Sequence, residues 1–478
     1  MNKVAKNYIY NLTYQILILI VPLITTPYVS RVLGAKGVGI FSYTNSIVQY
    51  FILFGCVGLN LYGQREIAYV QHKKEKRNIV FWELLITRFI TVSISLVLFL
   101  STLASHGKYA YVYILMTLDI LASMFDISWF FQGIEEFKKI VLRNCIIKII
   151  GVVLILTFVK SQEDLLRYVL CQSGTLLLGN LSIWLYLPKL VGKVSPRDIS
   201  IKRHIRPTLV LFLPQIATSV YTVLDKSMIG YLTSVEEEVA YYEQGQKIVK
   251  IVLALVTSLG TVILPRVANL FKLNEMDRIK KYLLKSFKFV FFLSFPMMFG
   301  LMAISANIVP WFFGEGYDKV VPNMMIIAPI LVFIALSNIT GVQFLLPTGR
   351  QKQYTISVVT GCLVNCCFNL LFIPKLLSLG AAIATIIAEL SVTAVQIYFT
   401  RKDFNYLSIF ISNVKYVICS LIMFIPTYLL AIRLSASIIN SIICAMVGCV
   451  VYLVLLLVMK DAFLLEMIDK VKSKIVKV

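Results

Sequence analysis

The sequence predicts an all-α membrane protein with fourteen transmembrane helices, and two observations lead to this fold class. Apolar residues make up 59% of the 478 residues and charged residues only 15%, whereas soluble domains carry roughly 45–50% and about 25%. The apolar residues also gather in runs of about 20, the length that crosses a hydrocarbon core of about 30 Å. The predicted spans are 8–30, 38–63, 79–104, 109–132, 141–160, 165–187, 208–232, 239–264, 287–309, 322–346, 354–374, 379–399, 411–432 and 437–459.

The distribution of lysine and arginine predicts the orientation of these spans. Both chain ends and the loops on one side hold 33 basic residues, whereas the short loops on the other side hold 8. Cytoplasmic loops carry the excess of basic residues in membrane proteins, so we expect a multi-pass protein of a bacterial cytoplasmic (inner) membrane with both termini in the cytoplasm. The net charge of +22 lies in these short clusters, which does not indicate binding to nucleic acid.

Two cytoplasmic segments have the pattern of amphipathic surface helices. In 265–288 and 460–478, apolar positions recur at helical spacing and lysines occupy the other face. This pattern is typical of a helix that lies on anionic lipid. A solvated tail is the alternative.

A parallel internal repeat relates two parts of the chain. The segment 21–26 (VPLITT) resembles 213–218 (LPQIAT), and 38–49 (VGIFSYTNSIVQ) resembles 239–250 (VAYYEQGQKIVK). The first and seventh predicted helices both begin in the cytoplasm, so the repeat axis runs along the membrane normal. We expect two six-helix lobes and an appendage: an N-terminal lobe at 1–190, a cytoplasmic linker at 191–207, a C-terminal lobe at 208–400, and helices 13 and 14 with an amphipathic cytoplasmic tail at 401–478.

Charged residues lie inside the seventh and eighth predicted spans, which carry Asp225, Lys226, Glu243, Lys247 and Lys250. An ionised side chain at the bilayer centre costs at least about 2.5–3.5 kcal/mol, so such residues face a protein interior or a watery cavity. One interpretation is a cationic cavity that binds an anion, with the two acids as support. The other is a structural ion-pair network that joins the two helices.

Further charged residues extend this hypothesis to other predicted helices. Arg31, at the outer end of the first helix, faces either the same cavity or a loop. Arg88, in the third helix, either contributes to the site or reaches the interface with its long stem. The intramembrane carboxylates Asp119 and Glu389 are candidates for a proton or cation site, or they pair with neighbouring lysines.

The sequence gives no sign of a catalytic centre or a cofactor site. The three histidines are far apart, and the sequence contains no GxSxG, HExxH, Walker or CxxC motif. Hydrolase, metalloprotease and ATPase functions therefore lack their residues. Cys362 and Cys366 lie one helical turn apart, but no histidine or acid joins them, so we expect no metal site.

Four segments resemble a known family: PYVSRVLGAKGVGIFSYTNSIVQYF (27–51), WFFQGIEEFKKI (129–140), LPQIATSVYTVLDKSMIGYL (213–232) and YYEQGQKIVKI (241–251). They resemble the Wzx-type polysaccharide repeat-unit flippases of the multidrug/oligosaccharidyl-lipid/polysaccharide exporter superfamily. The resemblance implies a protein that flips polyprenyl-pyrophosphate-linked oligosaccharides for O-antigen, capsule or another surface polysaccharide. It also implies membrane lipids as partners, together with polysaccharide polymerase and assembly proteins.

This resemblance gives the charged residues expected roles. Arg31, Lys226, Lys247 and Lys250 are expected to bind the pyrophosphate, and Arg88 is a further candidate for substrate binding. The resemblance also implies coupling to a proton or sodium gradient, for which Asp119 and Glu389 are the candidates.

Asp225 and Glu243 are expected to hold the lysines in place. A multidrug or cation antiporter of the same superfamily is the alternative function, but its cavity needs net acidic residues. A membrane enzyme needs a substantial external loop, and the predicted external loops are short.

Overall fold

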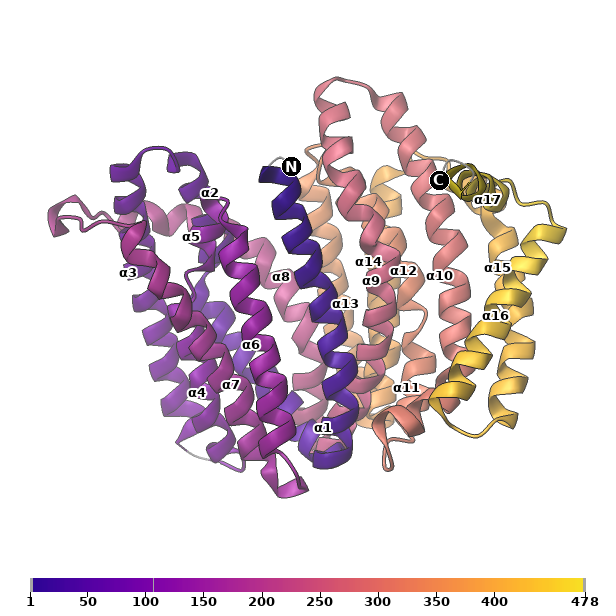
Figure 1. Ribbon diagram of the computed structural model, residues 1–478, viewed down its shortest axis with the longest axis horizontal. Helices are drawn as coiled ribbons and strands as arrows, with labels where there is room; N and C mark the ends of the chain where they lie inside the picture. Colours follow the sequence, from indigo (N-terminus) through magenta and orange to yellow (C-terminus); the bar gives the residue numbers. More distant parts are fainter. Residues whose placement is uncertain (1–2, 106, 476–478) are drawn as a thin grey trace. The chain divides into compact units, whose positions relative to one another are not determined.

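The computed structural model describes residues 3–105 and 107–475, and this part of the chain consists of helices joined by turns and short loops (Figure 1). The predicted all-α membrane fold class is confirmed. The chain divides into two compact units, Met1–Ala240 and Tyr241–Val478. Within the helices, the description leaves out the side chains of 3–16, 19, 210–211, 213–215, 217–218, 220–221, 259, 261–262 and 470–475. The 213–218 motif of the predicted repeat and the lysines of the tail beyond residue 469 therefore lie largely outside the described side chains.

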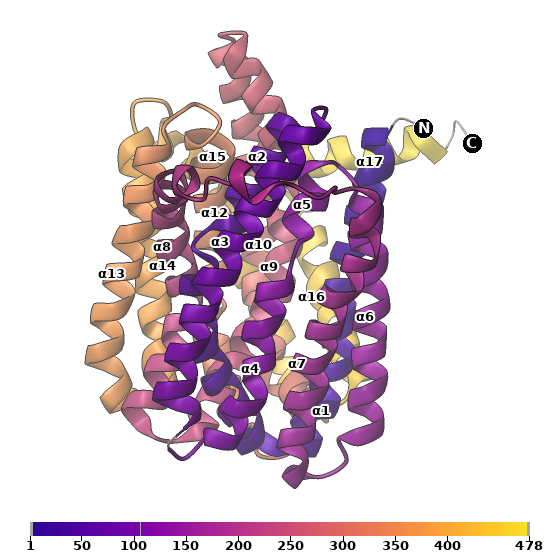
Figure 2. The same cartoon turned by 90° about the vertical axis from the view of Figure 1, so that its left-hand side faces the viewer.

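The first unit contains eight α-helices and the start of a ninth in its described part. Figure 2 shows α3, α4, α6 and α7 beside one another, and α2 and α5 lie together at one end of this unit. The bounds are α1 (Lys3–Cys56), α2 (Leu59–Val70), α3 (Lys74–Phe99), η1 (Leu100–Ala104), α4 (Ala110–Phe125), α5 (Ser128–Gly133), α6 (Phe137–Phe158), η2 (Gln162–Asp164), α7 (Leu165–Ser182), η3 (Ile183–Lys189), η4 (Pro196–Asp198) and α8 (Lys202–Thr233).

The second unit begins within the long helix α9, which starts in the first unit. Its buried apolar core lies mainly between α10 and α15, with side chains from α9, α16 and α17. The bounds are α9 (Glu236–Lys272), α10 (Met276–Phe313), α11 (Val320–Ile327), α12 (Ile330–Ser337), η5 (Asn338–Leu345), α13 (Gln351–Leu376), α14 (Ser378–Thr400), α15 (Tyr406–Arg433), α16 (Ile438–Val458) and α17 (Ala462–Ile475).

The helices coincide with the predicted spans. Among the described residues, 12 helical runs are long and apolar enough to cross a membrane. One of them, Ile20–Val70, contains the predicted span 38–63 and the end of the span 8–30. The helix α1 bends between these spans at Gly34 (φ 66°, ψ 175°), a conformation that glycine adopts readily. The helix α8 covers the predicted span 208–232 but is not one of the 12. The total of fourteen remains a prediction.

The predicted surface helix at 265–288 is wrong. The helix α9 continues to Lys272, and α10 begins at Met276 after a short turn. The apolar face of this segment belongs to the core of the second unit, where Val267, Ile279 and Leu283 are fully buried. Burial in protein therefore replaces the expected contact with lipid.

The C-terminal helix α17 is anchored at its first residues. Asp461 is fully buried, forms an ion pair with Lys415, and accepts hydrogen bonds from the Tyr416 hydroxyl (3.0 Å) and the Leu464 amide (2.9 Å). Burial disfavours the charged carboxylate, but these partners outweigh it and hold the pKa of Asp461 below its ordinary value. This cluster fixes the start of the tail to α15.

Candidate functional site

The two units share the predicted site residues. The first unit carries Arg31, Arg88, Asp119, Asp225 and Lys226, and the second carries Glu243, Lys247, Lys250 and Glu389. Asp225 and Lys226 lie on α8, whereas the other members of the predicted charge cluster lie on α9. The joint cavity that these helices were expected to line therefore remains a prediction.

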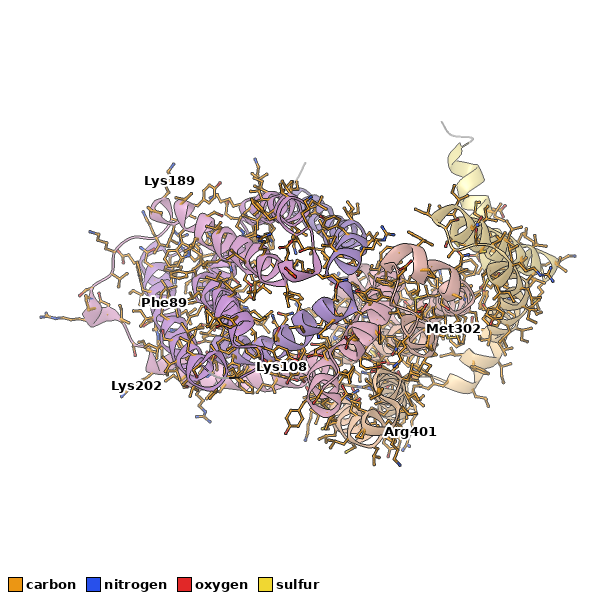
Figure 3. All side chains as sticks on the ribbon, turned by 90° about the horizontal axis from the view of Figure 1, so that it is seen from below. Phe89, Lys108, Lys189, Lys202, Met302 and Arg401 are labelled. Carbon is orange, nitrogen blue, oxygen red and sulfur yellow. The ribbon has the colours of Figure 1, made fainter. Side chains whose placement is uncertain are left out.

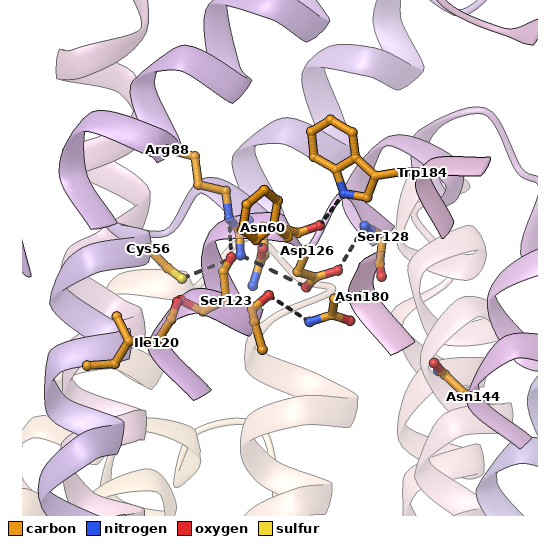
Figure 4. A network of polar contacts seen from close by, with 12 residues as sticks. Cys56, Asn60, Arg88, Ile120, Ser123, Asp126, Ser128, Asn144, Asn180 and Trp184 are labelled. Atoms are coloured by element: carbon orange, nitrogen blue, oxygen red, sulfur yellow. Dashed lines mark hydrogen bonds and ion pairs between the residues drawn. The ribbon is translucent and has the colours of Figure 1, made fainter. Parts of the chain in front are cut away.

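Arg88 lies in the interior of the first unit and is 1% exposed. Its guanidinium donates to the Ser123 carbonyl (2.7 Å) and to Asn60 Oδ1 (2.6 Å), and it lies 4.0 Å from Asp126 Oδ2. Figure 4 shows that these partners surround it. This geometry favours a structural role for Arg88 over contact with a substrate.

The partner of Arg88 is the C-terminal end of α4, which stops inside the unit at Phe125. The last carbonyls of a helix lack partners within the helix. Here Asn180 donates to the Ala122 carbonyl (2.7 Å) and Trp184 donates to the Phe125 carbonyl (2.7 Å), beside the contact of Arg88 (Figure 4). Side chains from α3, α7 and η3 thus stabilise a buried helix end, to which a cation is also attracted by the helix dipole.

The remaining predicted residues of the first unit lie in different settings. Asp119 on α4 accepts a hydrogen bond from the Ser173 hydroxyl on α7 (2.9 Å). Arg31 is exposed, three residues before the bend of α1. Asp225 is buried on α8, beside the half-buried Lys226.

In the second unit, the first half of α9 presents a polar face. Lys250 Nζ donates to Gln246 Oε1 (2.7 Å), and Gln246 Nε2 donates to the Tyr242 hydroxyl (2.9 Å). Successive residues of a helix are about 100° apart around its axis. Viewed along the axis of α9, Lys250 therefore lies between Tyr242 and Gln246 on one side and the predicted site residues Glu243 and Lys247 on the other. The three predicted residues of α9 therefore share one face.

Glu389 belongs to a buried polar stripe along α14. Thr385, Glu389, Thr393 and Gln396 recur at intervals of three or four residues, so they lie on one side of the helix, and all are at most 8% exposed. Gln396 donates to the Ser357 hydroxyl on α13 (3.0 Å) and accepts from Thr340 on η5 (2.6 Å).

Sequence reasoning missed every member of this stripe except Glu389, although the regular spacing is visible in the sequence.

At one end of the first unit, α4, α8 and α9 meet α1. Glu236, at the start of α9, pairs with Lys108 and accepts from the Tyr109 hydroxyl (2.7 Å). The hydrogen bonds with Glu236 and Tyr109 raise the pKa of Lys108. A Cβ atom on Gly39 of α1 would lie only 1.8 Å from the Glu236 carbonyl oxygen, so glycine is required there. Figure 3 views the unit from this end, with Lys108 labelled.

At the other end, a buried carboxylate fastens the predicted linker to α3. Glu83 is fully buried and accepts from the Ser200 amide (2.7 Å) and from the Arg203 guanidinium (3.1 Å). His204 Nε2 lies 2.9 Å from the same carboxylate, and its Nδ1 lies 2.8 Å from the Tyr62 hydroxyl. Glu83 and His204 could not be recognised from the sequence, because they lie more than a hundred residues from their partners in the chain.

Within the described residues, no group of three or more His, Cys, Asp or Glu side chains could hold a metal ion.

Comparisons with known proteins agree with the fold. The family model described as "Polysaccharide biosynthesis protein" matches residues 4–271, and the model described as "Lipid II flippase MurJ" matches residues 145–464. A protein of Escherichia coli strain K12 described as an O-antigen transporter is 24% identical over 83% of this chain and 97% of its own length. One from Shigella dysenteriae with the same description is 24% identical over 72% of this chain and 86% of its own length.

Solved structures show the same fold. The lipid II flippase MurJ in an inward closed conformation matches with a TM-score of 0.74 and 15% identity, over 95% of this chain and all of that one. An inward-facing multidrug resistance transporter of the MATE family matches with a TM-score of 0.60 and 14% identity, over 80% of this chain and 97% of that one.

Proposed function

Because the chain belongs to the polysaccharide biosynthesis protein family, we propose that it is a flippase for polyprenyl-pyrophosphate-linked oligosaccharide repeat units. It moves them from the cytoplasmic to the outer leaflet by alternating access, for the synthesis of a surface polysaccharide such as O-antigen or capsule. The O-antigen transporters cover most of this chain, and the fold of a lipid II flippase covers 95% of it. The chain is a multi-pass membrane transport protein and not an enzyme.

The observation that carries this proposal is the polar face of α9. Lys247 and Lys250 lie on one face of a helix whose apolar composition suits a membrane span. A pyrophosphate must carry its negative charge through a medium of low dielectric constant, and cations offset that cost through charge-assisted hydrogen bonds. A carrier of cationic drugs needs the opposite charge in its site.

Lys226, Lys247 and Lys250 bind the pyrophosphate, with Arg31 as a further contact.

Asp225 and Glu243 hold these lysines in place. Asp119 and Glu389 couple transport to a proton or sodium gradient, and no cofactor takes part. Membrane lipids, a polysaccharide polymerase and assembly proteins are the partners.

The finer cellular placement is a bacterial inner membrane with both termini in the cytoplasm. The positions of the basic loops support it. The two lobes at 1–190 and 208–400 are the proposed moving parts. The linker at 191–207 joins them, and the segment 401–478 is an appendage outside the repeat.

Deletion of the gene in its host tests the function. An impermeant glycosidase added outside spheroplasts reports which leaflet holds the lipid-linked repeat unit. We expect single units to accumulate where the enzyme cannot reach them, with loss of surface polysaccharide. Units that accumulate on the accessible side would indicate a polymerase or ligase instead, and unchanged polysaccharide with altered drug tolerance would indicate an antiporter.

A further inference from the structure

A chain of hydrogen bonds in the second unit connects α9 to α14. It begins at the Lys250 ammonium, passes through the Gln246 amide (2.7 Å) and the Tyr242 hydroxyl (2.9 Å), and reaches the Thr385 hydroxyl (2.9 Å). Tyr242, Gln246 and Lys250 are spaced by four residues, so they lie in a row along one side of α9.

The donor and the acceptor of each hydrogen bond can be assigned from the last residue in the series, Thr385. Thr385 donates its only hydroxyl proton to the Ala381 carbonyl (2.8 Å). Tyr242 therefore donates to Thr385, and its oxygen accepts from the amide nitrogen of Gln246. This arrangement turns the carbonyl oxygen of Gln246 toward Lys250.

The inner members of the chain are held in place by burial. Tyr242 is 1% exposed, Thr385 is 4% and Gln246 is 7%. The neighbouring residue Gly245 allows α9 to lie close to α11. A Cβ atom at this position would lie 3.3 Å from the Met324 amide nitrogen. The Gln246 carbonyl is therefore a fixed acceptor on a packed helix.

Lys250 differs from these residues because it is exposed, although it lies in an apolar span. An ammonium has three N–H donors, and Gln246 orients it by accepting one of them. An amide carbonyl accepts this hydrogen bond without bringing a negative charge of its own, whereas a carboxylate at this position would bring one. We propose that Gln246 is a positioning residue, kept in orientation by Tyr242, that aims the Lys250 ammonium at the pyrophosphate of the carried lipid. This inference rests on the proposed function.

Equilibrium binding of two lipids to the purified full-length chain tests the inference. The probes are a polyprenyl pyrophosphate and the polyprenyl phosphate with the same tail. We expect the wild type to prefer the pyrophosphate, and Gln246→Glu to weaken pyrophosphate binding about tenfold, since its carboxylate competes for a charge-assisted hydrogen bond. Binding of the polyprenyl phosphate should weaken less, so the ratio of the two binding affinities should decrease. Tyr242→Phe should decrease this ratio by a smaller factor, because the substitution only frees the Gln246 amide to rotate.

Thr257→Ala is the matched control on α9, because the Thr257 hydroxyl bonds only to its own helix at the Leu253 carbonyl among the contacts described. It should bind both lipids as the wild type does. If Gln246→Glu keeps the wild-type preference, the inference is overturned while the proposed function stands. Equal loss of both lipids with a lower melting temperature would show a purely structural role for Gln246. If the wild type binds neither lipid, the proposed function itself fails.

Discussion

Replacing Arg88 with leucine distinguishes the structural role that its contacts favour from its expected role in substrate binding. The change removes the donors to the Ser123 carbonyl and to Asn60, and it removes the cation beside Asp126. The end of α4 then keeps the hydrogen bonds from Asn180 and Trp184 but loses those from Arg88. If Arg88 is structural, the first unit loses stability; if it binds substrate, stability is kept and transport is lost.

The size of the loss follows from the burial of the pair. Removing one partner of a buried ion pair costs about 3–5 kcal/mol. The Asp126 side chain is 25% exposed and also accepts from the Ser128 amide, so the lower end, about 3 kcal/mol, applies. For a unit of this size, about 2–4 °C of melting temperature corresponds to each kcal/mol, which gives a decrease of about 6–12 °C.

Thermal unfolding of the detergent-purified chain, followed by size-exclusion chromatography of heated samples, measures this decrease. Arg88→Lys should give a smaller decrease, because it keeps the charge but loses the fork of donors. Lys148→Ala is the matched control, since Lys148 is an exposed cation on α6. An Arg88→Leu protein with the wild-type melting temperature and no transport would refute the structural role.

Three further predictions concern the ends of the units. Gly39→Val should leave little folded protein on size-exclusion chromatography, because its Cβ would meet the Glu236 carbonyl at 1.8 Å, whereas Gly174→Ala, with no neighbouring atom within 4 Å, should be tolerated. Lys108→Glu should lower the melting temperature, and the double variant that also carries Glu236→Lys should recover the wild-type value. A double variant that stays destabilised would count against the ion pair. The lowered pKa of Asp461 stabilises the fold at neutral pH. This contribution begins to decrease as the pH falls below the ordinary carboxyl pKa of about 4, and it is lost once the pH falls through the lowered pKa. The melting temperature of Asp461→Asn should therefore lie below that of the wild type at pH 7 and approach it on acidification; a constant difference would contradict this assignment.

Hydropathy was sufficient to locate the helices, because the bilayer requires long apolar runs whatever the tertiary packing. The bend at Gly34 was not predicted, although two spans were assigned on either side of it. The break at 126–127 within the predicted span 109–132 could not be predicted, because no glycine or proline marks it. Its stabilising side chains, Arg88, Asn180 and Trp184, come from distant parts of the chain.

The predicted site residues show the same division between local and distant information. The shared face of Glu243, Lys247 and Lys250 follows from helical spacing alone. Burial of Arg88 was not predictable, because a long side chain can reach the membrane surface or a buried carbonyl with equal ease. The link from Gln246 and Tyr242 to Thr385 depends on the packing of α9 against α14, which no sequence pattern specifies.

Transport by the purified chain in proteoliposomes tests the central claim most directly. A lipid-linked oligosaccharide is placed in both leaflets, and an impermeant glycosidase outside first digests the outer pool. We predict that the protected pool then becomes accessible in vesicles that contain the wild type, faster than in empty vesicles, and that Lys250→Ala abolishes this gain. The assay is run with imposed proton and sodium gradients. If the protected lipid-linked oligosaccharide becomes accessible no faster than in empty vesicles, although folded protein is present, the chain is not a flippase for this lipid.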